Sequence, residues 1–382
     1  MANQLVDIVN FNADASCLSS EKWLRCLEGG KQSSFYQWMM LYVKYEKKIS
    51  LGLIGATIAD IKLYNPESID LINNNQDIFE LLFRPWSHDI GIYRQDNAFI
   101  FNVQMGIEII KREFENIANF FLPPEFMINS KQIELLNSLN INSIFINPNR
   151  YDEQTALRIP RIPYKVLATS NVIANCISIE GSSTKAYLKS MQLYDDSIWN
   201  DSVFENKNDI LYSWRDGESV FLMPEGIERE EFWLKSEDKG IKRNFLDDLD
   251  IEYIENNDLK NPFYKTYPVH SFLAWMQEMK MLWYVEKISD IEKEFDNLSL
   301  EKKIIFLQLI NSDILASVEK QSLTVNIVIN NKTEKFIIYR QEKGFEGEEF
   351  LSLYNGSEIK KNSAYMKKFK ARQIYLNEQN QI

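Results

Sequence analysis

Short apolar runs that favour β-strands alternate with segments of helical periodicity along most of this 382-residue chain. The first run spans residues 4–11 (QLVDIVNF), helical spacing begins at Ser33, and residues 48–61 (KISLGLIGATIADI) have the pattern of a second strand and a turn. A helix that connects two strands of one sheet makes those strands parallel. The alternation therefore predicts an α/β protein with a parallel sheet, closed or open.

The same rhythm continues, less regularly, beyond residue 61. Further helices are predicted at 66–74, 102–114, 130–139, 231–249 and 269–286. Further strands are predicted at 77–86, 118–125, 142–148, 164–169, 175–181, 209–217 and 219–226. After them come a charged helical region, 289–318, and two alternating runs around Asn330-Asn331 that predict a β-hairpin. We therefore expect a barrel domain over 1–285 and a smaller accessory domain of helix and hairpins over 286–382.

Charge and cysteine content restrict the kind of partner. The net charge of −12 argues against a nucleic-acid surface, which needs clustered Lys and Arg. The three cysteines lack the CxxC spacing of zinc and redox sites and are expected to be reduced thiols. No leader-like segment and no run of about 18 apolar residues is visible, so we expect a cytoplasmic protein that binds no membrane. The oligomeric state is left open.

Polar residues that directly follow the apolar runs are the first candidates for a site, because barrel active sites lie at the carboxyl ends of the strands. Glu125 follows a run that ends in Pro123-Pro124, which fix the backbone and hold the carboxylate in place. Asp216 follows another run and precedes Gly217. Taken singly, each of these carboxylates also fits a capping or turn residue. Together they supply the two carboxylates that glycoside hydrolysis generally needs.

The order of these motifs resembles that of the family 57 glycoside hydrolases. DIFELLFRPWSHDI, with Glu80 and His88, is similar to one family motif, FLPPEFMINSKQIELLNSLNINSIFINPNRY to the nucleophile motif, and WRDGESVF to the motif of the acid/base aspartate. The resemblance implies an incomplete (β/α)7-type barrel that acts on α-glucans by a retaining mechanism. It also implies Glu125 as the nucleophile and Asp216 as the acid/base.

The first strand departs from the family pattern. Where the family has His-Gln-Pro, this chain has VNFNADAS, so Asn12 and Asp14 are the residues that we expect to hydrogen-bond to a sugar there. With Glu80 and His88 they complete the predicted polar contacts. The aromatic residues predicted to stack on sugar rings are Trp86, Tyr93, Phe126 and Trp214, although aromatic residues more often fill a core.

We therefore predict a retaining glycoside hydrolase or a 4-α-glucanotransferase-like enzyme whose partner is an oligosaccharide or polysaccharide, with no cofactor and no metal. One alternative is a relative that binds carbohydrate without turnover. Another is a metal-dependent polysaccharide deacetylase that uses Asp14 and His88, although position 92 is isoleucine and the His-x-x-x-His spacing of such enzymes is missing. The other histidine, His270, lies in an aromatic segment and is expected to pack.

Overall fold

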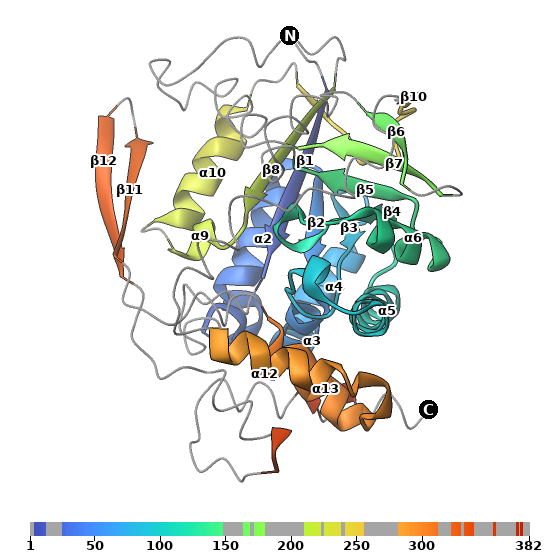
Figure 1. Cartoon of the computed structure of the whole chain (residues 1–382). Coiled ribbons are helices and arrows are strands. Elements are labelled where there is room, and N and C mark those ends of the chain that lie inside the picture. Colours follow the sequence, from blue (N-terminus) through green and yellow to red (C-terminus); the bar gives the residue numbers. More distant parts are fainter. Residues whose placement is uncertain are drawn as a thin grey trace.

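The computed structural model describes residues 4–12, 25–147, 163–168, 172–179, 210–222, 225–237, 241–255, 282–311, 322–329, 332–339, 354–356, 372–373 and 375–376. Within these ranges, ten strands form one sheet, in which the order of nine is β10-β6-β7-β5-β4-β3-β2-β1-β8 and β9 lies beside β1 (Figure 1). The strands are β1 (Gln4–Phe11), β2 (Ile49–Leu53), β3 (Phe79–Phe83), β4 (Ile117–Phe121), β5 (Ser143–Ile146), β6 (Tyr164–Leu167), β7 (Ile173–Ser178), β8 (Ile210–Asp216), β9 (Lys242–Arg243) and β10 (Ile254–Glu255).

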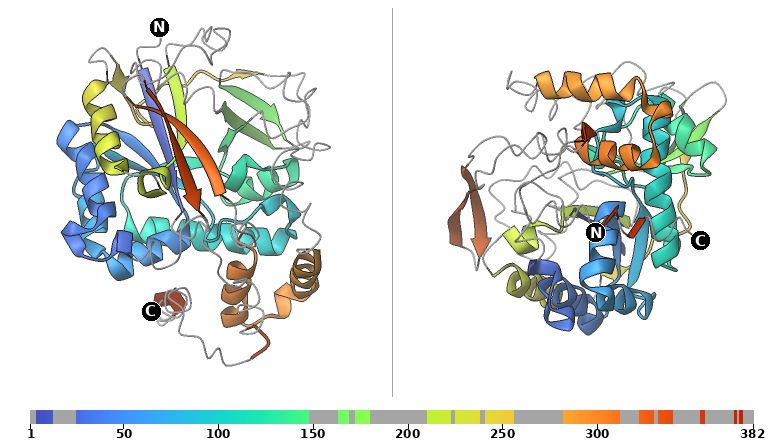
Figure 2. Two further views of the ribbon diagram at one scale, coloured as in Figure 1. Left: turned by 90° about the vertical axis from the view of Figure 1, so that its left-hand side faces the viewer. Right: turned by 90° about the horizontal axis from the view of Figure 1, so that it is seen from below.

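Every described pair in this sheet is parallel except β6 with β7. Helices follow most of the strands and cover the outside of the sheet (Figure 2). They are α2 (Ser34–Tyr45), α3 (Gly55–Tyr64), α4 (Pro66–Asn73), α5 (Asp96–Glu113), α6 (Ser130–Ser138), α9 (Ser219–Leu222), α10 (Gly226–Ser236), α12 (Leu282–Glu292) and α13 (Leu300–Leu309).

Local signals in the sequence fix several helix starts. The Ser33 hydroxyl accepts from the Tyr36 amide at the start of α2, and the Asn65 side chain accepts from the Ser68 amide at the start of α4. Asn129 and Gln132 form a reciprocal capping box at the start of α6. Each of these bonds satisfies a backbone N–H that has no partner within its helix.

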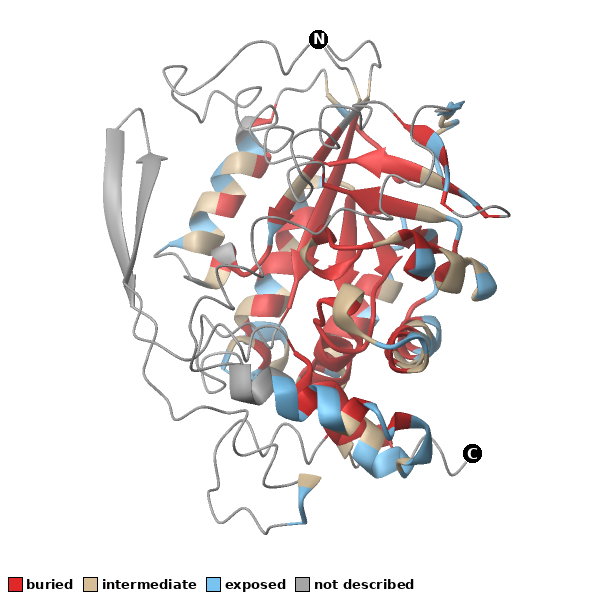
Figure 3. Ribbon diagram, in the orientation of Figure 1, coloured by how far each residue is buried: buried red, intermediate tan, exposed pale blue. Residues whose placement is uncertain are grey.

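The sheet is curled, and its two faces bury separate cores. The strand faces that turn outward pack on the helices, and Figure 3 shows the buried strands surrounded by helices that are exposed on their outer sides. The opposite faces contact one another in an inner core that includes Ile8 of β1, Leu82 of β3, Phe145 of β5 and Tyr212 of β8. Strands from across the sheet meet in this inner core only because the sheet closes partway on itself. The predicted incomplete parallel barrel is thus confirmed.

Three predicted elements differ from the structure. Residues 55–61 belong to helix α3 and not to a strand and turn, and the run 219–226, predicted as a strand, contains the short helix α9 and the start of α10. The helix predicted at 231–249 is α10, which ends at Ser236 before β9. Periodicity cannot separate a short buried helix from a buried strand when every position is apolar or small. In α9, Val220 and Phe221 pack into the outer core.

The region after the barrel contains helices α12 and α13 and then an antiparallel hairpin of β11 (Ser322–Ile329) and β12 (Lys332–Tyr339), as predicted. Helix α12 runs across the predicted division at residues 285 and 286, and that division stays a prediction. No helix of the described residues has the length and apolar content that a membrane span requires.

A buried ion pair joins the C-terminal segment to the barrel. The Arg372 guanidinium donates to both carboxylate oxygens of Asp60 in α3, each at 2.5 Å, and to Gln308 of α13 at 3.3 Å. Arg372 and Asp60 are almost fully buried. Arg372 therefore forms part of the interior.

The amino ends of the strands, which we call the floor of the barrel, hold a buried carboxyl group. Glu80 lies near the start of β3, where its carboxylate accepts from the Ser50 hydroxyl at 2.7 Å and the Leu246 amide at 3.3 Å. Burial raises the pKa of the Glu80 carboxyl to about 7, and these hydrogen bonds only partly oppose the rise. A carboxyl group whose pKa rises on folding binds its proton more tightly in the folded state. Its contribution to stability is therefore greatest below the unfolded value of 4.5 and is lost as the pH rises toward 7.

We predict that Glu80→Gln removes this pH dependence. Because one pKa unit corresponds to about 1.4 kcal/mol, the unfolding free energy of the wild type should fall by roughly 2–3 kcal/mol more than that of the variant between about pH 5 and about pH 8. Urea unfolding at the two pH values measures the difference. Glu134→Gln on α6 is the control and should follow the wild type. Parallel pH profiles for Glu80→Gln and the wild type would refute the assignment.

We also predict that Arg372→Met lowers the unfolding free energy by about 3–5 kcal/mol, because the Asp60 carboxylate is then buried without its counter-ion. The double variant Asp60→Leu/Arg372→Met should recover much of the loss. Thermal unfolding of the wild type, both single variants and the double variant gives the coupling energy. Losses that simply add would show that the two side chains do not stabilise each other.

Candidate active site at the carboxyl ends of the strands

Asp216 is the last residue of β8 and lies at the carboxyl end of the sheet, which we call the rim. Its Cα pairs with that of Asn10 in the parallel register of β8 on β1, and the Asn10 amide donates to the Asp216 carboxylate at 3.2 Å. Side chains alternate along a strand, so Asp216 projects to the same face as Tyr212 and Trp214, which contribute to the inner core. Asp216 is exposed. Its carboxylate therefore lies over the mouth of the barrel.

Glu125 lies in the loop after β4, within the short 3-10 turn η3 (Pro124–Phe126). Both Glu125 and Phe126 have left-handed backbones, with φ of 54° and 55°. The Phe126 amide donates to the Pro123 carbonyl at 3.0 Å and the Met127 amide to the Pro124 carbonyl at 3.1 Å, which closes the turn. Such a conformation costs of the order of 1–3 kcal/mol for each non-glycine residue and is concentrated at functional sites. The half-buried Glu125 is thus held in a costly and defined position.

An aromatic contact joins the loop of Glu125 to the strand of Asp216. The rings of Phe126 and Trp214 meet edge to face, with centroids 4.9 Å apart and an interplanar angle of 81°. Three strands separate β4 from β8 in the sheet order, so only the curl of the sheet brings these side chains together. The contact places one residue next to Glu125 against a residue two positions before Asp216. The two predicted carboxylates accordingly come from segments that meet inside the barrel.

Asn12 lies at the rim directly after β1. It is buried, and its backbone amide donates to the Glu218 carboxylate at 2.5 Å. Glu218 follows Asp216 by two residues, and between them the Gly217 amide donates to the Asn10 carbonyl at 2.6 Å. A Cβ on Gly217 would lie 2.6 Å from the Trp38 ring, so only glycine fits this turn. The segment that carries Asp216 is therefore tied to the end of β1. Asp14 lies outside the described residues.

Two other predicted site residues lie away from the rim opening. Glu80 is on the floor, at the opposite end of β3 from the rim, and its contacts indicate a structural role. Trp86 is fully buried in the outer core, where its ring lies against Gly55, and this indicates packing. Phe126 is buried too, whereas Trp214 is only half-buried. Of the two predicted tryptophans, Trp214 is the one that is partly exposed.

His88 and its neighbour Asp89 are buried in the segment between β3 and the 3-10 turn η2 (Gly91–Tyr93). The Asp89 carboxylate lies 3.3 Å from the Arg94 guanidinium, which lies 3.2 Å from Glu292 of α12. Burial raises the pKa of Asp89 to about 7, and the attraction of Arg94 only partly opposes the rise. Arg94 thus links Asp89 of the barrel to Glu292 of α12. In the described part of the chain, no group of three His, Cys, Asp or Glu side chains is placed to hold a metal ion.

Three rim residues were not predicted from the sequence. Asn10 and Glu218 contact Asp216 and Asn12 as described, and Arg84 follows β3 with its side chain buried on the inner face, within 3.5 Å of the Gly52 carbonyl. Arg84 brings a buried positive charge to the strand next to β4, which leads to Glu125. The signal for Arg84 was available, because it directly follows an apolar run and precedes Pro85.

Comparison with known proteins supports the resemblance found in the sequence. The model of glycosyl hydrolase family 57 matches residues 11–178, which include Glu125 and end before Asp216. The sequence matches no curated protein. Among solved structures, a 4-alpha-glucanotransferase from Thermococcus litoralis is similar with a TM-score of 0.56 and 11% identity over 87% of this chain. The chain spans 62% of the length of that glucanotransferase.

The alpha-amylase AmyC from Thermotoga maritima is also similar in fold, with a TM-score of 0.51 and 8% identity over 83% of this chain and 87% of that one. Both likenesses extend beyond the segment matched by the family model. They agree with the curled parallel sheet and with the helices that cover it. Residues 11–178 of the chain thus match the family 57 model, and the fold of the described residues is similar to that of both solved structures.

Proposed function

We propose that this protein is a retaining glycoside hydrolase or glycosyltransferring enzyme that acts on an α-glucan or a related oligosaccharide. Glu125 is the nucleophile and Asp216 the general acid and base. The observation that carries the proposal is the contact of Phe126 with Trp214, which joins the strained turn of Glu125 to the strand of Asp216 at the mouth of the barrel. The family match and the two similar structures, which are described as a 4-alpha-glucanotransferase and an alpha-amylase, agree with this class of reaction.

The proposed reaction has two steps. In the first, the Glu125 carboxylate attacks the anomeric carbon and forms a glycosyl ester, while Asp216 gives its proton to the departing glycosidic oxygen. In the second, the Asp216 carboxylate takes a proton from water or from a sugar hydroxyl, whose oxygen displaces Glu125. Water as the acceptor gives hydrolysis and a sugar as the acceptor gives transfer. Neither step needs a cofactor.

Side chains around the two carboxylates fit this division of roles. Asp216 accepts a hydrogen bond from the neutral Asn10 amide and is exposed, as a residue that gives a proton to a leaving-group oxygen must be. Glu125 is less exposed and is held by a turn that the two prolines introduce. A nucleophile benefits from such a fixed position, because effective molarity depends on alignment. Trp214 is the proposed sugar platform, and Asn12 is proposed as a polar contact.

Activity measurements on Glu125→Gln and Asp216→Asn test the assignment. We expect reducing-sugar release or chain-length redistribution from a panel of α-glucans to fall at least about 10³-fold in each variant, because each removes a group that acts in the transition state. Glu134→Gln and Asp290→Asn, on the exposed surfaces of α6 and α12, are matched controls with wild-type activity. Near-ultraviolet circular dichroism verifies that all four variants are folded.

A second experiment separates the roles of the two carboxylates. Azide added to Asp216→Asn should restore turnover of a substrate with a good leaving group and yield a glycosyl azide, whereas Glu125→Gln should give no product of retained configuration. Full activity in either variant would contradict the proposed mechanism. Sugar binding by a wild-type protein that turns over no substrate would instead favour the binding-only relative.

A further inference from the structure

The position of Asp216 depends on what holds the end of β8. In the described sheet β8 is the last strand, and its one neighbour is β1. Backbone pairing reaches from Gln4 opposite Ile210 to Asn10 opposite Asp216. An edge strand has hydrogen-bonding partners on one side only, so its end is less constrained than that of a central strand. Side-chain contacts of the residues beside Asp216 add to the constraint that this pairing gives.

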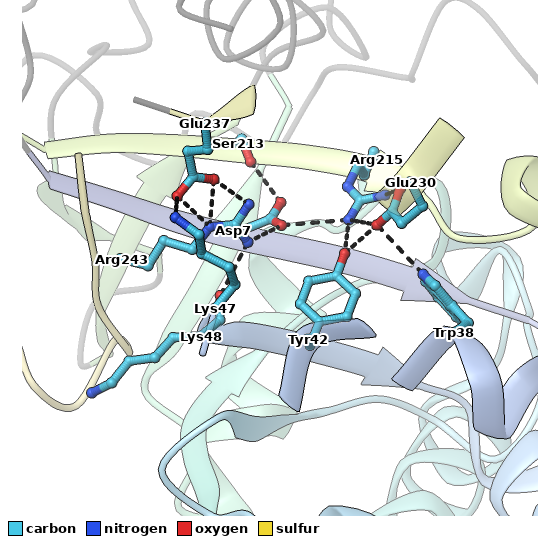
Figure 4. A network of polar contacts seen from close by, with 10 residues as sticks. All are labelled: Asp7, Trp38, Tyr42, Lys47, Lys48, Ser213, Arg215, Glu230, Glu237 and Arg243. Carbon is cyan, nitrogen blue, oxygen red and sulfur yellow. Dashed lines mark hydrogen bonds and ion pairs between the residues drawn. The ribbon is translucent and has the colours of Figure 1, made fainter. Parts of the chain in front are cut away.

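The residue before Asp216 supplies such a constraint on the outer face. Neighbouring side chains of a strand project to opposite faces, so Arg215 points outward while Asp216 points to the barrel mouth. The Arg215 guanidinium donates to both oxygens of Glu230 in α10, at 2.9 and 2.6 Å, and to Asp7 of β1 at 3.4 Å. It also donates to the Tyr42 hydroxyl of α2, which itself donates to Glu230 (Figure 4).

This contact set is buried and charge-balanced. The three carboxylates of Asp7, Glu230 and Glu237 face the guanidinium groups of Arg215 and Arg243 and the ammonium group of Lys47. Burial alone would raise the pKa of Asp7, but the two nearby guanidinium groups outweigh it and lower the pKa. The Asp7 carboxylate therefore stays ionised at neutral pH. A paired, forked guanidinium contact fixes the direction of a side chain more strictly than a single ammonium contact does.

We propose that Arg215 is a positioning residue for Asp216. By anchoring the end of β8 to α10, α2 and β1, it fixes the backbone from which the Asp216 carboxylate projects. This inference rests on the proposed function, since it gives Asp216 a catalytic role. Arg215 itself faces away from the substrate and takes no part in the chemistry.

The same network contains a matched control. Arg243 is equally buried and makes comparable ion pairs, to Asp7 at 2.8 Å and to Glu237 at 2.6 Å. It belongs to β9, which pairs with β1 at Gln4 and Leu5, near the floor of the barrel. Loss of the paired guanidinium contacts of Arg243 therefore weakens the network but leaves the contacts at the rim in place. A purely structural network would respond in the same way to changes at either arginine.

The test compares Arg215→Lys with Arg243→Lys in the full chain, since each variant keeps the charge and removes the fork. Hydrogen exchange of the Gly217 amide reports on the rim, because this amide donates to the Asn10 carbonyl. We expect Arg215→Lys to raise its exchange rate at least about tenfold and to lower kcat about tenfold or more with KM changed less than about twofold. Arg243→Lys should lower the melting temperature and leave both rim exchange and kcat unchanged.

Equal effects of the two variants on rim exchange and kcat would overturn the proposal, because the network would then be structural only. If Arg215→Lys does not fold, Glu230→Gln takes its place, since it keeps the shape of the anchor and removes its charge. Failure of the proposed function is recognised separately. Activity that survives in Glu125→Gln and Asp216→Asn refutes that function, while the exchange comparison still decides whether Arg215 fixes the rim.

Discussion

The parallel pairing of β1 with β8 is the constraint on which the rest of the barrel depends. It joins segments about two hundred residues apart in the chain, and it occupies the edge of β1 that β2 leaves free. Without it, β1 would be an edge strand and its inner face would lose the neighbours Tyr212 and Trp214. The pairing also sets the register that puts Asn10 beside Asp216. Loop-closure entropy opposes a contact between segments so far apart in the chain. The buried ion pairs of Figure 4 also connect β1 with β8 and so support this pairing.

Much of this architecture could be predicted from the sequence, because strand and helix periodicity is local. The run QLVDIVNF is β1, and the predicted runs at 48–61 and 77–86 contain β2 and β3. The strand predictions for residues 55–61 and 219–222 were wrong, because these segments have no clear periodicity. A helix buried on nearly all sides, such as α3, has no polar face to give it a period. The Arg215 network was also beyond the sequence, because its partners in β1, α2 and α10 become neighbours only after the sheet has curled.

In the candidate site, too, some positions followed from the sequence and others did not. Asn12, Glu125 and Asp216 directly follow apolar runs, and all three lie at the rim, because β1, β4 and β8 run in the same direction and end on the same side of the sheet. Glu80 lies within its run rather than after it, and the motif that suggested it carries no information about which end of the strand the residue occupies. Trp86 follows its run but lies on the helix-covered side, where Gly55 makes room for its ring. Position along a strand is therefore more predictable than the direction of a side chain beyond the strand end.

The interior of the barrel is layered, and the layers separate two kinds of buried carboxyl group. Along β3 the inward positions run from Glu80 on the floor through Leu82 to Arg84 at the rim, and along β1 from Val6 through Ile8 to Asn10. Within the described residues the middle layer is apolar and closely packed, and it separates the floor from the rim. A raised pKa at Glu80 consequently affects folding stability, whereas the chemistry that we propose at the rim uses groups above the apolar layer. Perturbed titration alone would point to the floor of the barrel, whereas the direction of the strands supports the proposed site at the rim.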